Sequence, residues 1–374
     1  MRARLSVACL LTALAFVSPA NGGVPNVVAR AYFVQDATTG EVLAQKNADE
    51  QLPIASITKL MTVIVALDRK VPLGQRVTVR RTAAAVGEST IHLRVGERIS
   101  VSDLLKAALI QSANDAADAL ADRFGPGEEA FVERMNETAQ TDGLFRTHFT
   151  RPDGLDAPGH VSTARDVTRL AHLAMRIPVV RAIVRQRTAH ISGKRTLHTW
   201  NDLLGLFRGL DGVKTGHTGG AGWCEVAEVK RDGLDVYATI LGSPARGRRN
   251  ADLAALLRWA FSVERPAWVI PPGRVYVRVS TGYGRGAIPL VPARAVSRPV
   301  RIDRPLVERV SAPEAVSLPV HRGEVLGEVR VSAGGRLVAR EQLVAARGAS
   351  APGVVGRFGY YARRTFSHVG GWLP

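Results

Sequence analysis

Two residues that can do chemistry together lie three positions apart in the stretch LPIASITKLMTV, which runs from Leu52 to Val63. They are Ser56 and Lys59. Residues at i and i+3 of a helix share a face, and the neighbours here are apolar nearly all round, which predicts a buried helix. Burial disfavours an ammonium and lowers the pKa of a lysine towards that of a base. A lysine of that kind beside a hydroxyl can turn the serine into a nucleophile.

The S-x-x-K spacing alone is common, and it is equally compatible with a solvated Lys59 and with Ser56 as an N-cap. Two further motifs strengthen the catalytic interpretation. Ser112-Ala113-Asn114 lies at a predicted break between two helices, and Lys214-Thr215-Gly216 begins a predicted strand. Gly216 would let a substrate backbone lie close along the strand edge. The order S-x-x-K, S-x-N, K-T-G is that of the penicillin-recognising serine enzymes.

Six segments, in the same order along the chain, resemble the low-molecular-mass penicillin-binding proteins, which are serine-type D-alanyl-D-alanine carboxypeptidases. They are residues 36–43, 52–62, 112–121, 160–171, 199–204 and 211–224. The resemblance covers about residues 28–262, and the remainder of the chain is similar in plan. It implies removal of the last D-alanine from peptidoglycan stem peptides, and covalent inhibition by β-lactam antibiotics.

The resemblance also implies a role for each motif residue. Ser56 attacks the carbonyl of the penultimate D-alanine and becomes acylated, and Lys59 takes its proton. Ser112 and Lys214 relay a proton to the departing D-alanine, and Asn114 holds the amide on the acyl side.

The family's remaining binding groups are expected near the K-T-G motif. Thr215 binds the terminal carboxylate with the help of an arginine, for which Arg249 fits the family spacing and the adjacent Arg248 stays open. The backbone N–H groups of Ser56 and His217 form the oxyanion hole, and Gly216 lines the substrate strand. The sequence departs from the family pattern at Gly219 and Gly220, which predicts a loosened loop.

The elements that must position these residues follow from periodicity. Strands are expected over 28–43 with a turn at Asp36–Gly40, helices over roughly 100–185, strands over 210–242 with a turn at Arg231–Gly233, and a helix over 250–261. Helix caps are expected at Ser102 and at Ser162 or Thr163. This order indicates one sheet with a helical insert. The predicted fold class is α/β (α+β): a β-lactamase/transpeptidase-like domain with an antiparallel sheet and a helical subdomain.

The sequence pattern changes after the Pro-Pro pair at 271–272. The catalytic domain is expected over 24–263 and a small all-β, sandwich-like domain over 268–346. Residues 350–374 predict a basic amphipathic helix that lies in a membrane interface. The alternative for this tail is a terminal helix docked on the second domain.

The N-terminus predicts export. Arg2 and Arg4 precede an apolar run from Leu5 to Val17, and small residues follow, so residues 1–20 read as a secretory signal peptide. The expected location is the periplasm, at the outer face of the inner membrane. Cleavage removes Cys9 and leaves Cys224 as a single buried core cysteine, so no internal disulfide is expected.

The formal charge of +17 raises the question of nucleic-acid binding. Seventeen arginines and no lysine follow Glu264, against six acidic residues, so most of the excess lies in the C-terminal part. An exported protein meets anionic lipid and wall polymer rather than nucleic acid, and a G- and C-rich genome also encodes arginine often. The nine histidines are scattered, so no metal or cofactor is expected. Packing is the predicted role of Trp200 and Trp223, with lining of the cleft as the alternative.

Three other functions stay open at this stage. A D,D-endopeptidase of peptidoglycan crosslinks would use the same residues. A class A-like β-lactamase would need a glutamate for deacylation between the second and third motifs, and the chain has none between Thr138 and Cys224. A non-catalytic wall- or lipid-binding protein would be expected to lack some of the motif residues, yet all are present.

Overall fold

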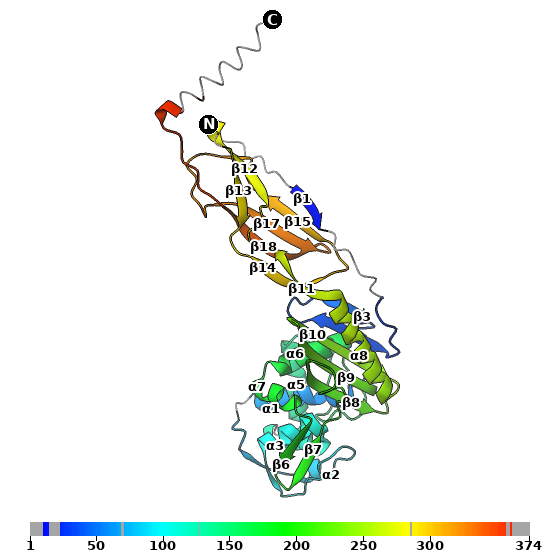
Figure 1. Ribbon diagram of the computed structural model, residues 1–374. Helices are drawn as coiled ribbons and strands as arrows, with labels where there is room; N and C mark the ends of the chain where they lie inside the picture. The colour runs from blue at the N-terminus through cyan, green and yellow to red at the C-terminus, as the bar shows by residue number, and fades with distance from the viewer. Residues whose placement is uncertain are drawn as a thin grey trace. The chain divides into compact units, whose positions relative to one another are not determined.

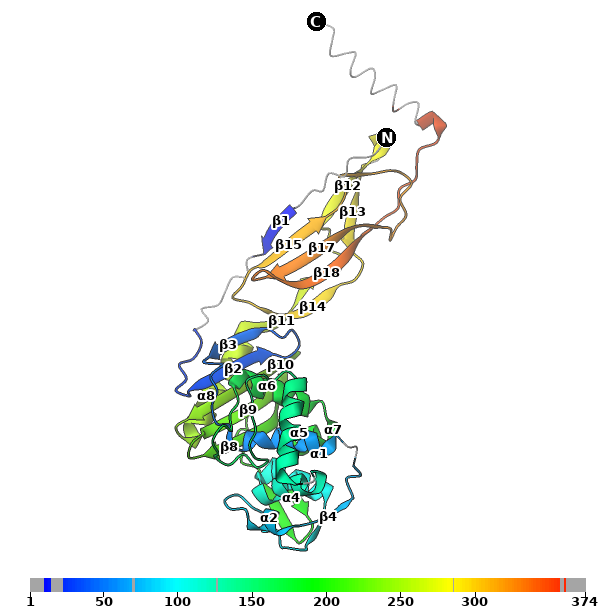
Figure 2. The ribbon, with the colours of Figure 1, turned by 180° about the vertical axis from the view of Figure 1, so that it is seen from behind.

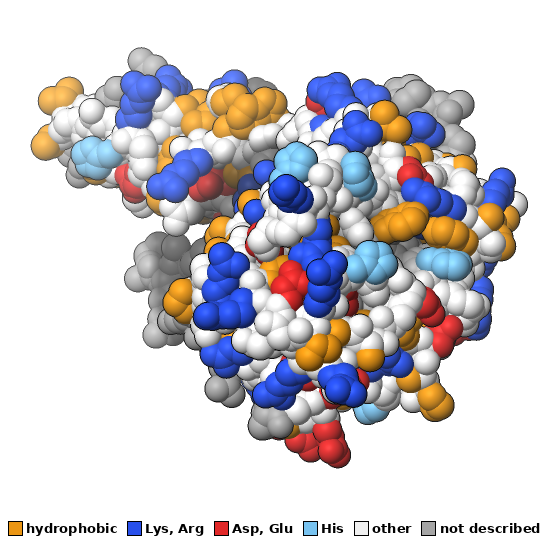
Figure 3. Space-filling model, turned by 90° about the horizontal axis from the view of Figure 1, so that it is seen from below, with side chains coloured by type: hydrophobic (Ala, Val, Ile, Leu, Met, Phe, Trp, Pro, Cys, Tyr) orange, Lys and Arg blue, Asp and Glu red, His pale blue; other side chains and the backbone are white. Residues whose placement is uncertain are grey.

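The computed structural model describes residues 10–14, 23–68, 71–125, 127–284, 286–356 and 360. Contacts between residues divide the chain into two compact units, one of residues 22–262 and one of residues 1–21 with 263–374. Figure 1 shows the elements of both units in chain order. On the face drawn in Figure 3, basic side chains are more numerous than acidic ones, in keeping with the formal charge of +17.

An antiparallel sheet of five strands forms the centre of the first unit. Its order is β3-β2-β10-β9-β8. The strands are β2 (Ala31–Asp36), β3 (Val42–Lys46), β8 (Leu210–Thr218), β9 (Gly222–Arg231) and β10 (Leu234–Ser243). Both predicted turns lie between paired strands, so the hairpin expectations are confirmed. Strand β8, which carries the K-T-G motif, lies at an edge of the sheet.

Helices cover both faces of this sheet. Helix α8 (Arg246–Val263) lies on one face, and α6 (Ala164–Met175) packs against β2, β9 and β10 on the other (Figures 1 and 2). The remaining helices of the unit are α1 (Lys59–Leu67), α2 (Arg81–Ala85), α3 (Val101–Lys106), α4 (Asn114–Phe124), α5 (Glu128–Thr141) and α7 (Pro178–Val184). The predicted fold class, an antiparallel sheet with a helical subdomain, is confirmed.

Sequence patterns missed α2 and two short hairpins, whereas α7 falls within the region 100–185 that was expected to be helical. The hairpins are β4 (Arg76–Thr78) with β5 (Arg98–Ser100), and β6 (Thr188–Ile191) with β7 (Arg195–His198). Each of these elements is seven residues long or shorter, too short for a periodic pattern to stand out.

One predicted helix cap is wrong and one is resolved. Helix α3 is capped by Ser100, whose side chain accepts a hydrogen bond from the N–H of Asp103, so the predicted cap at Ser102 is incorrect. The helix begins earlier because Val101 is fully buried and belongs to its first turn. For α6, Thr163 is the cap, accepting from the N–H of Asp166, while the Ser162 hydroxyl bonds to Thr147.

The core of the first unit gathers around α1. Nearly every residue of this helix is buried, and α1 contacts α4, α5 and α6. Cys224 on β9 is fully buried among these apolar residues, as predicted. Burial of α1 places its first residue, Lys59, in a dry environment, and the active-site geometry depends on that placement.

The second unit is built of strands around its own apolar core. Its sheets are β1-β15-β17-β18-β13-β12-β16 and β11-β14. The strands are β11 (Glu264–Ile270), β12 (Val277–Thr281), β13 (Ala287–Pro292), β14 (Val296–Arg301), β15 (Leu306–Ser311), β16 (Ala315–Val316), β17 (Val325–Ala333) and β18 (Arg336–Ala345). An all-β second domain is therefore present, as the predicted fold class requires.

Part of the predicted signal peptide pairs with this sheet. Residues Leu10–Leu14 form strand β1, which runs antiparallel to β15 at the sheet edge. Because β1 is an edge strand, its removal by cleavage would leave the other strands of the sheet paired. Of the predicted amphipathic helix over 350–374, residues 357–359 and 361–374 lie outside the described residues. Among the described residues, no helix is both long and apolar enough to cross a membrane.

Candidate active site

Ser56 lies on a turn of 3-10 helix, Ala55–Thr58, and Lys59 is the first residue of α1. The predicted single helix through both residues is therefore wrong in detail, although their spacing still works. A 3-10 helix has three residues per turn, so side chains at i and i+3 lie directly above one another. Ala55 adopts φ +50°, a left-handed conformation that costs a non-glycine residue about 1–2 kcal/mol. The surrounding packing holds this strained turn and points Ser56 into the site.

Lys59 is fully buried, and three oxygens surround its ammonium group. Its Nζ lies 2.8 Å from Ser56 Oγ, 2.7 Å from Asn114 Oδ1 and 2.5 Å from the carbonyl oxygen of Asp153. Burial lowers the pKa of Lys59 to about 8, although the nearby carboxylate of Asp153 acts in the opposite direction. A lysine with this pKa can be neutral at moderately alkaline pH and accept the proton of Ser56.

The S-x-N motif follows a distorted helix end. Helix α3 continues as a turn of π-helix, Ala107–Gln111, and Ser112 then adopts the left-handed conformation with φ +65°. π-helical turns of this kind occur frequently at functional sites. Helix α4 begins at Asn114, whose amide bonds Lys59 on one side and the carbonyl of Gly87 on the other. The break expected from the sequence is present, and it places both polar residues at the site.

Strand β8 brings a second lysine to the same place. Lys214 is buried and its Nζ lies 2.8 Å from Ser112 Oγ and 2.7 Å from the carbonyl oxygen of Thr215. Burial lowers the pKa of Lys214 well below its ordinary value, and the positive charges of Lys59 and Arg249 lower it further. The site therefore holds two serine–lysine pairs.

Gly216 lies where β8 closely approaches the Ala55–Thr58 turn. A Cβ at this position would lie 2.8 Å from the carbonyl oxygen of Ile54 and 3.1 Å from the backbone nitrogen of Ser56. Only glycine fits without moving one of these segments. The motif predicts only substrate approach for this glycine, whereas the structure shows that it also lets the strand pack against Ser56.

A loop that the sequence analysis did not identify completes the base of the site. Besides the Asp153 carbonyl bonded to Lys59, the carbonyl of Pro152 accepts a hydrogen bond from Thr62 at 2.5 Å. The Asp153 carboxylate is buried and paired with Arg151 through contacts of 2.6 and 2.7 Å. Gly154, with φ +81°, leaves room for the carbonyl oxygen of Ala55, since a Cβ there would lie 2.2 Å from it. The only local signal for this loop is its cluster of Pro, Asp and Gly, which indicates a turn.

His160 supports the Ala55–Thr58 turn through its contact with Thr58. It is buried, its Nδ1 accepts the N–H of Thr150, and its Nε2 lies 2.7 Å from the hydroxyl of Thr58. That hydroxyl donates to the carbonyl of Ala55. Burial lowers the pKa of His160 to about 4, so the ring is neutral near pH 7 and acts as a structural histidine.

The motif residues open into a pocket of about 190 Å³. Its wall includes Ser56, Ser112, Thr215, Gly216, His217 and Arg249. Of the two candidate arginines, the structure places Arg249 at this pocket, with 1 % of its side chain exposed. Arg248 is 54 % exposed and lies near Asp252 instead.

Two tryptophans also line this pocket, which was the alternative to their predicted role in packing. Trp200 is 44 % exposed and donates its ring N–H to the carbonyl of Gln111. Trp223 stacks on His217 with ring centroids 4.0 Å apart. Their positions depend on long-range packing that a single sequence does not reveal. Glu88 and Ser89 line the pocket as well and carried no sequence signal.

The loop after β8 is held more firmly than its two glycines predicted. The Asp156 carboxylate accepts hydrogen bonds from the Thr218 hydroxyl at 2.6 Å and the Gly220 N–H at 2.8 Å. A Cβ at Gly220 would lie 2.9 Å from the same carboxylate, so this glycine permits the contact. Among the described residues, no group of three or more His, Cys, Asp or Glu is arranged to hold a metal ion.

A serine hydroxyl beside a buried lysine of lowered pKa, with a second serine–lysine pair nearby, is an arrangement that can support acyl transfer on a serine. The chain belongs to peptidase family S11, described as D-alanyl-D-alanine carboxypeptidase, whose pattern matches residues 18–245. The chain is 32 % identical to D-alanyl-D-alanine carboxypeptidase DacC of Escherichia coli K12, over 97 % of this chain and 95 % of that protein.

An endopeptidase and a solved structure are also similar to this chain. The D-alanyl-D-alanine endopeptidase of Pseudomonas aeruginosa is 34 % identical over 68 % of this chain and 84 % of its own length. Among solved structures, penicillin-binding protein 5 of Haemophilus influenzae superposes with a TM-score of 0.66 at 27 % identity, covering 90 % of this chain and all of that one. These findings confirm the predicted family and the predicted class of enzyme, a serine-type peptidase.

Proposed function

We propose that this protein removes the terminal D-alanine from peptidoglycan stem peptides through an acyl intermediate on Ser56. The observation that carries the proposal is the 2.8 Å contact between Ser56 Oγ and the Nζ of fully buried Lys59. Neutral Lys59 takes the hydroxyl proton as Ser56 attacks the carbonyl carbon of the penultimate D-alanine.

Charge that develops on the carbonyl oxygen is stabilised by backbone donors. The N–H groups of Ser56 and His217 are the proposed oxyanion hole, and the close seating of Gly216 against Ser56 N supports it because it brings the two segments together. Removing one such donor typically costs about 3–4 kcal/mol of transition-state stabilisation. Asn114, already bonded to Lys59, offers its amide to the acyl side of the substrate.

The leaving group departs on the other side of the pocket. Cleavage of the C–N bond needs a proton on the D-alanine nitrogen, and the Ser112–Lys214 pair at 2.8 Å is the proposed route. Water then hydrolyses the acyl-enzyme and regenerates Ser56. β-Lactams acylate the same serine, and slow release is expected because the chain has no glutamate between Thr138 and Cys224.

The terminal carboxylate is the feature that favours a carboxypeptidase over an endopeptidase. Thr215 and Arg249 both line the pocket, and a guanidinium suits a free carboxylate. The endopeptidase remains the second candidate because a relative of that name matches the chain over most of its length.

The place of action is also part of the proposal. A signal peptide over 1–20 would deliver the protein to the periplasm, where its substrate lies, and the basic tail over 350–374 would contact the outer face of the inner membrane. The N-terminal charge and hydropathy pattern and the C-terminal arginines support this location. No nucleic-acid role is proposed.

The first test is covalent labelling. The purified protein and its Ser56→Ala variant are each incubated with a fluorescent penicillin. Mass spectrometry then measures the mass of any covalent adduct. We expect one stable adduct on the parent and none on the variant, after which release of D-alanine from a pentapeptide separates carboxypeptidase from endopeptidase. A folded parent that takes up no penicillin would refute the acyl-serine mechanism.

A further inference from the structure

A buried acidic side chain lies beside the pocket and has no part in the mechanism above. Glu225 on β9 has 0 % of its side chain exposed, and neither carboxylate oxygen has a hydrogen-bond partner among the described residues. In the sheet register Glu225 lies directly opposite Thr215 of β8. Directly opposite residues of an antiparallel pair project from the same face, so Glu225 neighbours a residue proposed to bind the terminal carboxylate.

Its charge partner is the other proposed carboxylate-binding residue. Glu225 Oε2 lies 3.0 Å from Nε of Arg249. That guanidinium directs hydrogen bonds from Nε and Nη2 to Asn250 Oδ1, at 3.1 and 2.7 Å, which explains why the Glu225 contact is ionic without being a formed hydrogen bond. The third nitrogen, Nη1, has no hydrogen bond within the described part of the chain and is the one left for a ligand.

We propose that Glu225 competes with the substrate's terminal carboxylate for Arg249, so that this buried residue makes affinity for a free C-terminus depend on pH. The proposal rests on the role of Arg249 given under the proposed function. Arg249 also lies 3.5 Å from the carboxylate of Asp202, so a substrate carboxylate would meet strong repulsion from an ionised Glu225 beside the same buried guanidinium. A bound carboxylate substrate therefore drives Glu225 to take up a proton.

The groups around Glu225 fix the direction of the effect. Arg249 and Arg246 face it from α8, Lys214 from β8, and Asp202 from the loop before β8; its β10 neighbour in the register is the apolar Ile240. Burial raises the pKa of Glu225 to about 7, and the charge of Arg249 opposes the rise. Below that pH Glu225 is neutral and Arg249 is free to bind a carboxylate. Above it, ionised Glu225 neutralises Arg249 and affinity falls.

The same strand supplies a matched control. Glu228 is also buried on β9, but it is three residues away and so projects from the opposite face. There it accepts a hydrogen bond from the Tyr237 hydroxyl and pairs with Lys230, both at 2.6 Å. A change at Glu228 alters buried charge in the same strand without touching Arg249.

The test measures binding without turnover. In a Ser56→Ala background, the Kd of a peptide ending in D-Ala-D-Ala is measured by titration calorimetry from pH 6 to 8.5. We expect the Kd to rise above pH 7 by up to about tenfold per pH unit, the limit for one coupled proton. Adding Glu225→Gln should flatten the profile to within twofold, and adding Glu228→Gln should leave the slope in place. The same peptide ending in a D-alanine amide should show no slope.

The possible results distinguish failure of this proposal from failure of the proposed function. A slope that persists in the Glu225→Gln protein overturns the proposal, and so does loss of all peptide binding in that protein, because Glu225 would then orient Arg249 instead of competing for it. Glu225→Gln with Ser56 intact should still be acylated by penicillin, which checks the fold of the site. If the parent is not acylated, the proposed function fails, an outcome distinct from a flat or unchanged pH profile.

Discussion

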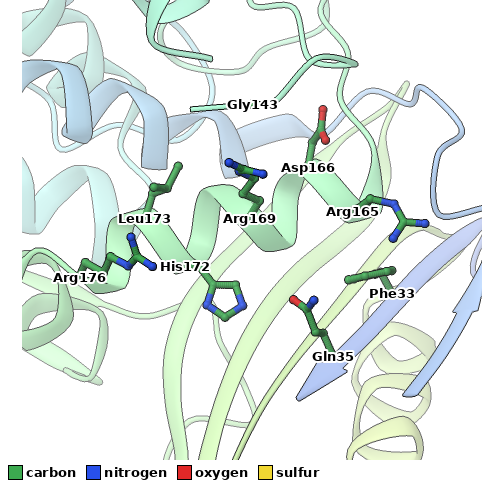
Figure 4. Close-up of a pocket in the computed structure, with 9 residues that line it drawn as sticks. All are labelled: Phe33, Gln35, Gly143, Arg165, Asp166, Arg169, His172, Leu173 and Arg176. Atoms are coloured by element: carbon green, nitrogen blue, oxygen red, sulfur yellow. The ribbon is translucent and has the colours of Figure 1, made fainter. Parts of the chain in front are cut away.

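Two cavities in the first unit differ in a way that shows what marks a catalytic site. The pocket at Ser56 has about 190 Å³, whereas a cavity of about 390 Å³ lies along α6. Figure 4 shows the second cavity, in which Arg165, Arg169, His172 and Arg176 lie along one side of the helix. The larger and more strongly charged cavity is lined by neither Ser56 nor Ser112, the serines that lie 2.8 Å from the two buried lysines.

The difference is desolvation. Arg169 and Arg176 are exposed, and Arg165 pairs with Asp49 at 2.7 Å while stacking over Phe33. Charges in contact with water keep ordinary chemistry and interact weakly. Lys59 and Lys214 are fully buried, and burial is the largest cause of their lowered pKa values. We therefore expect reactivity to depend on the removal of water from these charges and not on the volume of the cavity.

The largest expected effect contrasts the two kinds of cation directly. Lys59→Ala should lower the rate of acylation by penicillin by about 10³-fold, because a positioned general base contributes about 10²–10⁴. Arg169→Ala, which removes a cation from the α6 cavity, should change that rate less than twofold. Stopped-flow or gel-based acylation rates measure both. Comparable losses in the two proteins would mean that net charge, not desolvation, drives the reaction.

The second prediction tests the loop at Gly154, which packs against the Ala55–Thr58 turn. Gly154→Ala would place a Cβ 2.2 Å from the Ala55 carbonyl oxygen and should lower acylation by about 10²-fold, since a displacement near 1 Å can cost that much. Gly159→Ala is the control, because Gly159 has a similar φ of +77° with no atom nearer than 3.8 Å. Both variants carry the same backbone strain, so equal losses of activity would argue against the steric explanation.

The third prediction concerns pH. In the proposed mechanism acylation requires neutral Lys59, whose pKa burial lowers to about 8. Below pH 8 the neutral fraction falls tenfold per pH unit, so kcat/KM should rise with pH and level off above about pH 8. The dependence of kcat/KM on pH is measured with an ester substrate whose leaving group carries no charge. A rate that stays flat from pH 6 to 8 would exclude Lys59 as the titrating base.

The smallest effect belongs to the α6 cavity itself. Arg176→Ala should change the free energy of unfolding by no more than about 0.5 kcal/mol, as usual for an exposed residue with no structural partner. D-Alanine release should stay within twofold of the parent. Urea unfolding and a D-alanine assay measure the two quantities. A loss of activity at preserved stability would show that the α6 cavity takes part in catalysis after all.

The recognisable motifs were predictable because their chemistry is local. Ser56 and Lys59 are separated by one turn, and Lys214, Thr215 and Gly216 are consecutive, so spacing alone indicated which residues belong together. The antiparallel hairpins were predictable for the same reason, since the turns at Asp36–Gly40 and Arg231–Gly233 are encoded by adjacent residues. The choice between Arg248 and Arg249, in contrast, depended on which of two neighbouring residues faces the pocket.

What the sequence determined by itself was the family, the hairpins of the central sheet, the longer helices, and the residue types of the site. The tertiary structure alone decided that the Asp153 carbonyl bonds Lys59, that Trp200 and Trp223 line the pocket, and that Glu225 lies 3.0 Å from Arg249. The physical reason is distance along the chain. Asp153 is 94 residues from Lys59, and contacts across such a separation arise from packing, which leaves no periodic mark in the letters.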